Sequence, residues 1–142
     1  MKKNVILTAF ILACCFVFAA CGKGDANDII GVWKTENVGY YTITTFNEDG
    51  SFGSVYTVSD PQAVEAYGIT QEMLDTMKNE SYYKFVPAKS LSDEEKDEAA
   101  GRFAIKIFAT REDMESDTNG SMSYYTVDGD TLVLDGCVFA RN

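Results

Sequence analysis

The sequence contains no histidine in its 142 residues, and it has only two prolines, one tryptophan and four cysteines. The missing histidine excludes His-based catalytic triads and most zinc sites, and it removes the usual general base at neutral pH. A free cysteine without histidine cannot form the pair of a cysteine protease. Carboxylates are abundant, but none stands in a recognisable glycosidase pattern. The sequence therefore predicts a protein that is not an enzyme and that needs no cofactor.

Positive charge is also scarce. Lysine and arginine number 12 against 22 aspartates and glutamates, and because two of the lysines precede position 20, residues 21–142 carry 10 − 22 = −12. Such a chain repels phosphate backbones, so no nucleic acid partner is expected. Beyond position 21 the only cysteine is Cys137, which excludes an internal disulfide in that part of the chain. We expect Cys137 to be a small buried apolar residue rather than a reactive thiol.

The first 20 residues have the pattern of a bacterial lipoprotein signal peptide. Two lysines precede an apolar run from Val5 to Ala20, which ends at Phe18-Ala19-Ala20-Cys21. Small residues before a cysteine and a polar stretch after it favour cleavage and lipidation at Cys21, although Cys14 and Cys15 are competing thiols. Sixteen residues of helix span roughly 24 Å, which is short of the ~30 Å hydrocarbon core. We therefore expect a lipid anchor at Cys21 that holds the protein to the membrane in the cell envelope, outside the cytoplasm.

Three segments follow from this interpretation. Residues 1–20 are the signal peptide, residues 21–28 are the lipidated cysteine and a flexible tether without large apolar side chains, and residues 29–142 are a single domain.

The domain begins with strand-like segments. Residues 29–33, 40–46 and 52–58 are rich in β-branched and aromatic side chains, and Asn47 to Ser51 is a hairpin signal. A three-residue loop with Gly50 in the left-handed conformation pairs Phe46 with Phe52, which packs better than the alternative register. Both faces of this hairpin are half apolar, so alternation does not decide which face points inward.

Helical signals occupy the middle of the chain. Asp60 and Pro61 are typical of the start of a helix, and Gly68 is typical of its end. Ser92 begins a capping box, which predicts a second, short and acidic helix. Around residues 70–78 the four-residue spacing of Ile69, Met73 and Met77 predicts an apolar stripe with Leu74 beside it.

Strand signals return in residues 103–110. Turns at Asp128-Gly129 and Asp135-Gly136 then divide the tail into strands 121–127, 130–134 and 137–141. About seven sequential antiparallel strands predict a mainly β fold: a small antiparallel up-and-down β-barrel with a helical insert in residues 59–101.

The motifs Gly31-Val32-Trp33, the hairpin from Thr45 to Phe52 and the segment from Tyr125 to Leu132 together resemble the lipocalin-like domains of short bacterial lipoproteins. Residues 59–101 match no part of that pattern. The resemblance implies that Trp33 closes one end of the barrel and packs beneath Arg141 of the last strand. A guanidinium over an indole contributes about 0.5–2 kcal/mol. Trp33 as ordinary core is an equally good interpretation, and neither makes it a ligand contact.

Two groups of residues are candidates for binding. Aromatic and hydroxyl side chains of the first hairpin could line an apolar site, and the candidates are Tyr40, Thr42, Phe46, Phe52, Tyr56, Met73 and Met77. The two methionines could form a pliable lid over the barrel mouth, or they could simply pack against the barrel as buried core, which we favour for a stripe at helical spacing. Glu115, Asp117 and Asn119 have part of the spacing of a calcium loop, but a glutamate stands first and Thr126 occupies the twelfth position. We therefore favour a solvated turn there and expect no metal site.

Two interpretations of function stay open. In the first, a non-catalytic, membrane-anchored, lipocalin-like barrel binds a small apolar ligand. In the second, the barrel is filled by its own side chains and serves as a surface protein-interaction or structural module. A barrel of about eight strands can be either, so the interior distinguishes them.

Overall fold

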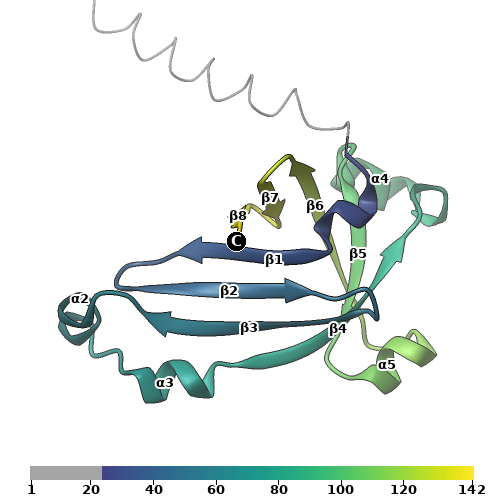
Figure 1. The fold of residues 1–142 in the computed structure, drawn as a ribbon. Helices are drawn as coiled ribbons and strands as arrows, with labels where there is room; N and C mark the ends of the chain where they lie inside the picture. The colour runs from purple at the N-terminus through teal and green to yellow at the C-terminus, as the bar shows by residue number, and fades with distance from the viewer. Residues whose placement is uncertain (1–23) are drawn as a thin grey trace, which may run out of the picture.

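Eight antiparallel strands, each hydrogen-bonded to the next along the chain, close into a barrel in the computed structural model, which describes residues 24–142 (Figure 1). The predicted mainly β, up-and-down barrel is thus confirmed. The strands are β1 (Gly31–Glu36), β2 (Tyr40–Phe46), β3 (Ser51–Val58), β4 (Asn79–Val86), β5 (Phe103–Phe108), β6 (Ser121–Asp128), β7 (Thr131–Leu134) and β8 (Cys137–Arg141). The helical elements are η1 (Ala26–Ile29), α2 (Pro61–Ala66), α3 (Gln71–Thr76), η2 (Ala88–Ser90), α4 (Asp93–Ala99) and α5 (Arg111–Ser116).

The first hairpin has the predicted register. Phe46 pairs with Phe52 and Thr42 with Tyr56, and Gly50 has φ +83°. The Asp49 carboxylate accepts the Ser51 backbone N–H at 2.9 Å, which fixes the turn. Burial decides the question that alternation left open, because Thr42, Thr44 and Phe46 are buried while Val55 on the opposite face is exposed. The face that contains Phe46 therefore points into the barrel.

The two C-terminal turns differ in how well they were predicted. Leu134 pairs with Cys137, which leaves Asp135 and Gly136 as the predicted two-residue loop. Asp128, however, pairs with Thr131, so the preceding loop is Gly129-Asp130, one residue later than predicted. Of the two loop residues, only Gly129 has a positive φ. The turn therefore has glycine as the first of its two central residues, whereas the prediction had placed glycine second.

The middle of the chain contains a barrel strand as well as helices. α2 and α4 begin at the predicted caps, Asp60 and Ser92. Between α3 and α4, β4 pairs with both β3 and β5, so the barrel has eight strands and the count of seven was wrong. Helix α5 was not predicted either. Its N-cap is Thr110, whose hydroxyl accepts the Asp113 backbone N–H.

The chain before β1 is ordered earlier than predicted. Residues 26–29 form the 3-10 helix η1, with a capping box between Asp25 and Asp28. The Tyr125 hydroxyl donates a hydrogen bond to the Ala26 carbonyl, and Ile29 is fully buried. A flexible tether that reaches Asp28 is therefore wrong, because η1 is packed against the barrel. Residues 1–20, with Cys14 and Cys15, as well as the predicted anchor Cys21, lie outside the described residues.

Candidate functional site

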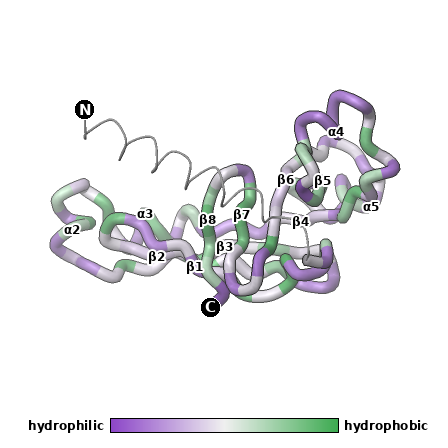
Figure 2. Tube along the Cα trace, turned by 90° about the horizontal axis from the view of Figure 1, so that it is seen from above, coloured by the Kyte–Doolittle hydropathy of each residue, from purple (hydrophilic) through white to green (hydrophobic). Residues whose placement is uncertain are grey.

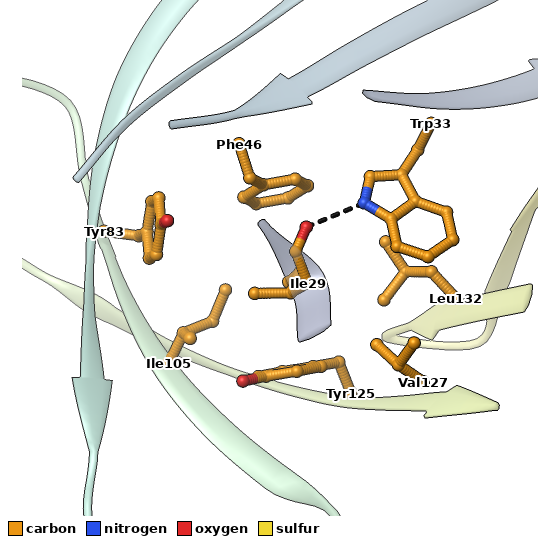
Figure 3. Close-up of a cluster of buried hydrophobic side chains, with 8 residues drawn as sticks. All are labelled: Ile29, Trp33, Phe46, Tyr83, Ile105, Tyr125, Val127 and Leu132. Carbon is orange, nitrogen blue, oxygen red and sulfur yellow. Dashed lines mark hydrogen bonds between the residues drawn. The ribbon is translucent and has the colours of Figure 1, made fainter. Parts of the chain in front are cut away.

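The inward-facing side chains form one continuous cluster that occupies the barrel interior. Figure 3 shows eight buried residues from β1, β2, β4, β5, β6, β7 and η1 converging on each other. They are Ile29, Trp33, Phe46, Tyr83, Ile105, Tyr125, Val127 and Leu132, and none is more than 6% exposed. An interior filled in this way is a packed core.

Aromatic rings fill the part of the interior near the first hairpin. Phe46 and Phe52 stack with centroids 5.0 Å apart, and Tyr83 meets the Phe46 ring edge-on at 5.5 Å. The Tyr83 hydroxyl donates to the Asn47 carbonyl at 2.7 Å, so its polar atom is satisfied. Burial, together with the nearby carboxylates of Asp49 and Glu48, raises the pKa of Tyr83. Tyr83 is therefore a neutral structural residue at physiological pH.

The predicted ligand face is divided by this packing. Phe46 and Phe52 belong to the packed core, whereas Tyr40 and Tyr56 lie further along the hairpin, half-buried, with their rings 6.4 Å apart. Thr42 is buried, and its hydroxyl accepts a hydrogen bond from the Asn37 side chain at 3.2 Å. These residues share the inward face of β2 and β3, but they do not line either cleft described below.

The methionines of α3 do not form the predicted buried stripe. Leu74 is 2% exposed, whereas Met73 and Met77 are 52% and 49% exposed. The helix contacts β3, and its orientation is set by Gln71, whose side chain accepts the Val58 N–H and donates to the Tyr56 carbonyl. The Gln71 amide thus hydrogen-bonds backbone groups of β3 that lie beyond its pairing with β4. These bonds orient α3 so that Leu74 is buried.

An apolar cleft of about 390 Å³ lies where η1 meets the ends of β4 and β5. Phe85 and Phe103 line it together with Val86, Leu91 and Ala104, and Arg102 is its charged residue. The Arg102 guanidinium already donates to the Ala99 and Glu98 carbonyls, and it lies 5.2 Å from the Tyr124 ring. This cleft was not anticipated, because the strand β4 that forms one wall was not predicted.

A second cleft, of about 320 Å³, lies on the outer face of β4 and β5. Lys84 and Lys106 are direct cross-strand partners there, and Glu95 and Asp117 also line the cleft. The Lys106 ammonium lies 2.9 Å from the Asp117 carboxylate, and this hydrogen bond lowers the pKa of Asp117. Two cations and two carboxylates give this cleft no net charge.

The calcium-loop candidates are dispersed by secondary structure. Glu115 lies in α5, Asp117 is its left-handed C-cap and bonds to Lys106, and Asn119 donates to the Asp113 carboxylate at 2.9 Å. Within residues 24–142, no group of three or more Asp, Glu or Cys side chains is placed to hold a metal ion.

Cys137 is exposed, which corrects the expectation that it is buried. It is the first residue of β8 and pairs with Leu134 of β7, but β1 pairs only with Ala140 and Arg141, so no strand of the described chain is paired along the other side of Cys137.

Trp33 and Arg141 lie together where the barrel closes. They are direct partners between β1 and β8, and the guanidinium carbon lies 4.2 Å from the centre of the indole. The indole N–H donates to the Ile29 carbonyl at 2.7 Å, and Arg141 donates to the Asp28 carbonyl at 3.3 Å. Both side chains therefore attach η1 to the barrel, and neither lines either cleft.

Comparisons with protein-family models, with curated proteins and with solved structures find no match for this chain. Across the part of the chain that the structure describes, no helix combines the length and the apolar character needed to cross a membrane.

Proposed function

We propose that this protein is a lipid-anchored, non-catalytic surface module of the cell envelope that acts through its outer surface. The second interpretation is thus preferred to a ligand-binding lumen. The observation that carries this proposal is the packed interior, in which the side chains of Trp33, Phe46 and Tyr125 occupy the space that a ligand would need. The absence of histidine from the sequence supports a non-catalytic role.

Anchoring through Cys21 is part of the same proposal and is supported by the sequence pattern that ends there. Ala26 is five residues beyond Cys21, so the chain between them reaches at most roughly 18 Å. An anchor at Cys21 would hold the η1 end of the barrel close to the membrane surface.

The indole N–H of Trp33 provides a test, because it is the only tryptophan and lies inside the barrel. In a ¹H–¹⁵N spectrum its signal should stay in place when a fatty acid, a quinone or a tetrapyrrole is added in excess. Because the cleft beside η1 is lined by residues of the short helix whose Ile29 carbonyl accepts this N–H, the titration is repeated with Ala88→Trp, which fills that cleft. A saturable shift of the Trp33 signal that persists in Ala88→Trp would mean that the interior admits ligands, and the filled-barrel proposal would then fail.

A small apolar ligand remains the second candidate function, and the cleft beside η1 favours it. Its lining is mostly apolar, with one guanidinium, which suits an apolar molecule that has an acidic end. Palmitate is a suitable probe, and Ala88→Trp would fill the cleft. Binding that is saturable in the wild type and lost in Ala88→Trp would support this function, while equal behaviour of the two would contradict it. Lys89→Trp, the neighbouring position outside the lining, is the matched control.

A further inference from the structure

Most of the exposed large apolar side chains of the described chain are gathered at one end of the barrel. Val38 is 62% exposed, Tyr67 69%, Met73 52% and Met77 49%. Single exposed apolar residues are common, whereas a concentration of them in one region of the surface is a feature of interaction sites. We refer to these four residues, with the carboxylates of Glu65 and Glu72, as the distal surface.

The fold places these residues at the same end of the barrel although they belong to separate elements. Tyr40 pairs with Val58, so the β1–β2 turn that holds Val38 lies beside the end of β3, where α2 begins. A Cβ atom on Gly39 would lie 2.8 Å from Val64, which shows how closely this turn packs against α2. Gln71 then fixes α3 to the edge of β3 through two hydrogen bonds.

This surface lies at the end of the barrel opposite to the start of the described chain. η1 precedes the beginning of β1, whereas Val38 follows its end. Figure 1 and the perpendicular view of Figure 2 both show α2 and α3 at one end of the molecule and α4 at the other. If the chain is anchored through Cys21, the distal surface faces away from the membrane.

The charge around the apolar side chains is mostly negative. Residues 59–78 contain four carboxylates, of Asp60, Glu65, Glu72 and Asp75, and a single cation, Lys78. Among the described residues none of these five forms an ion pair. The side chains of Glu65 and Glu72 are exposed, so their charges are available to a partner.

We propose that the distal surface docks a segment of a partner protein that carries apolar side chains flanked by lysine or arginine. This inference rests on the proposed function and names the chemistry of the partner. Thioether side chains adapt to varied apolar surfaces, and an exposed tyrosine is a typical anchor residue of interfaces. The surrounding carboxylates attract a basic segment and repel anionic lipid surfaces, which selects a protein partner.

The test uses residues 24–142, which contain every barrel strand and both buried clusters. The probe is a model peptide in which leucine and lysine residues alternate. The matched control is the same peptide with every lysine replaced by glutamate. We expect the lysine peptide to bind and to shift the backbone amide signals of Val38, Tyr67, Met73 and Met77. The glutamate peptide should not bind, and added salt should weaken the binding of the lysine peptide.

Two double variants test the two components. Met73→Gln with Met77→Gln, and Glu65→Gln with Glu72→Gln, should each weaken binding by about fivefold or more, the order expected when anchors of an interface are removed. The controls are Val138→Thr, an exposed apolar residue of β8, and Glu94→Gln with Glu112→Gln on α4 and α5.

Shifts that centre on another surface, or distal variants that bind as tightly as the controls, would overturn the proposal. Thermal melting of each variant separates lost binding from lost folding. The result is independent of the Trp33 titration, since a ligand inside the barrel would contradict the filled-barrel proposal while leaving the peptide experiment unchanged.

Discussion

At the residue scale, Trp33 connects three parts of the molecule. Its ring is fully buried, its N–H bonds to the Ile29 carbonyl, and its face carries the Arg141 guanidinium. One residue thereby joins η1, the core and the strand pair that closes the barrel. Gly31 begins β1 with φ +139°, a conformation that other residues rarely adopt, and a Cβ atom there would lie 3.0 Å from the Arg141 guanidinium, which would have to shift slightly.

Replacing Trp33 by alanine should destabilise the domain severely. Truncation of a buried aromatic side chain costs about 3–5 kcal/mol, a large part of the ~5–15 kcal/mol that holds a domain folded. Thermal melting followed by circular dichroism measures the effect. Trp33→Phe, which keeps a ring but loses the hydrogen bond, should lower the melting temperature less. A melting temperature of Trp33→Ala equal to that of the wild type would contradict the position assigned to this residue.

Asp113 provides a pH-dependent prediction. Hydrogen bonds from Asn119 and Thr110 hold the pKa of its carboxyl below the ordinary value of 3.8. A carboxylate with a lowered pKa in the folded state stabilises the protein above its ordinary pKa, and this contribution is lost as pH falls through the folded value. Asp113→Asn should therefore melt below the wild type at about pH 6, and the gap should close towards about pH 2.5. A gap that is constant over this range would show that the carboxylate charge contributes nothing.

At the scale of the elements, several caps and turns were predicted correctly from a residue type that determines the backbone conformation, although the turn at Gly129 was placed one residue too early. The caps at Asp60 and Ser92, the turn at Gly50 and the loop at Gly136 were all identified from such residues. β4 was missed because its first residues, Asn79 and Glu80, are polar and exposed, and because its pairing with β3 is a long-range contact. The clefts, which depend on β4, could not be derived without it.

Gly53 shows how close the approach of β4 is. A Cβ atom there would lie 2.7 Å from the Asn79 carbonyl oxygen. Gly53→Ala should push the two strands apart and cost about 1–3 kcal/mol, the usual range for overpacking. Chemical denaturation compares it with Val55→Ala, an exposed position on the same strand, which should be nearly neutral. Equal stability of Gly53→Ala and the wild type would mean that β3 and β4 do not approach in this way.

At the scale of the whole molecule, the two ends of the barrel differ in chemistry. The η1 end is closed by Ile29, Trp33 and Arg141 and is the end nearer to Cys21 along the chain. The opposite end exposes methionine and tyrosine among carboxylates that form no ion pair within the described residues. This polarity suits a protein that is held at one end and makes contacts at the other.

Anchoring itself is tested by Cys21→Ala. In cells labelled with a fatty-acid analogue, this variant should lose the label, because no acceptor thiol remains at the predicted cleavage site. Cys137→Ala should keep the label, since that residue lies in β8. Undiminished labelling of Cys21→Ala would assign the acceptor to Cys14 or Cys15 and would contradict the predicted boundary at residue 20.

The central claim is that the barrel is filled by its own side chains. Native mass spectrometry of the protein released from its host membrane tests this most directly, because it weighs the folded protein with whatever it carries. We predict the mass of the lipidated chain alone, with no further small molecule lost on activation. A bound species of a few hundred daltons that is retained through purification, released by collisions and still present in Ala88→Trp, in which the cleft beside η1 is filled, would contradict the account.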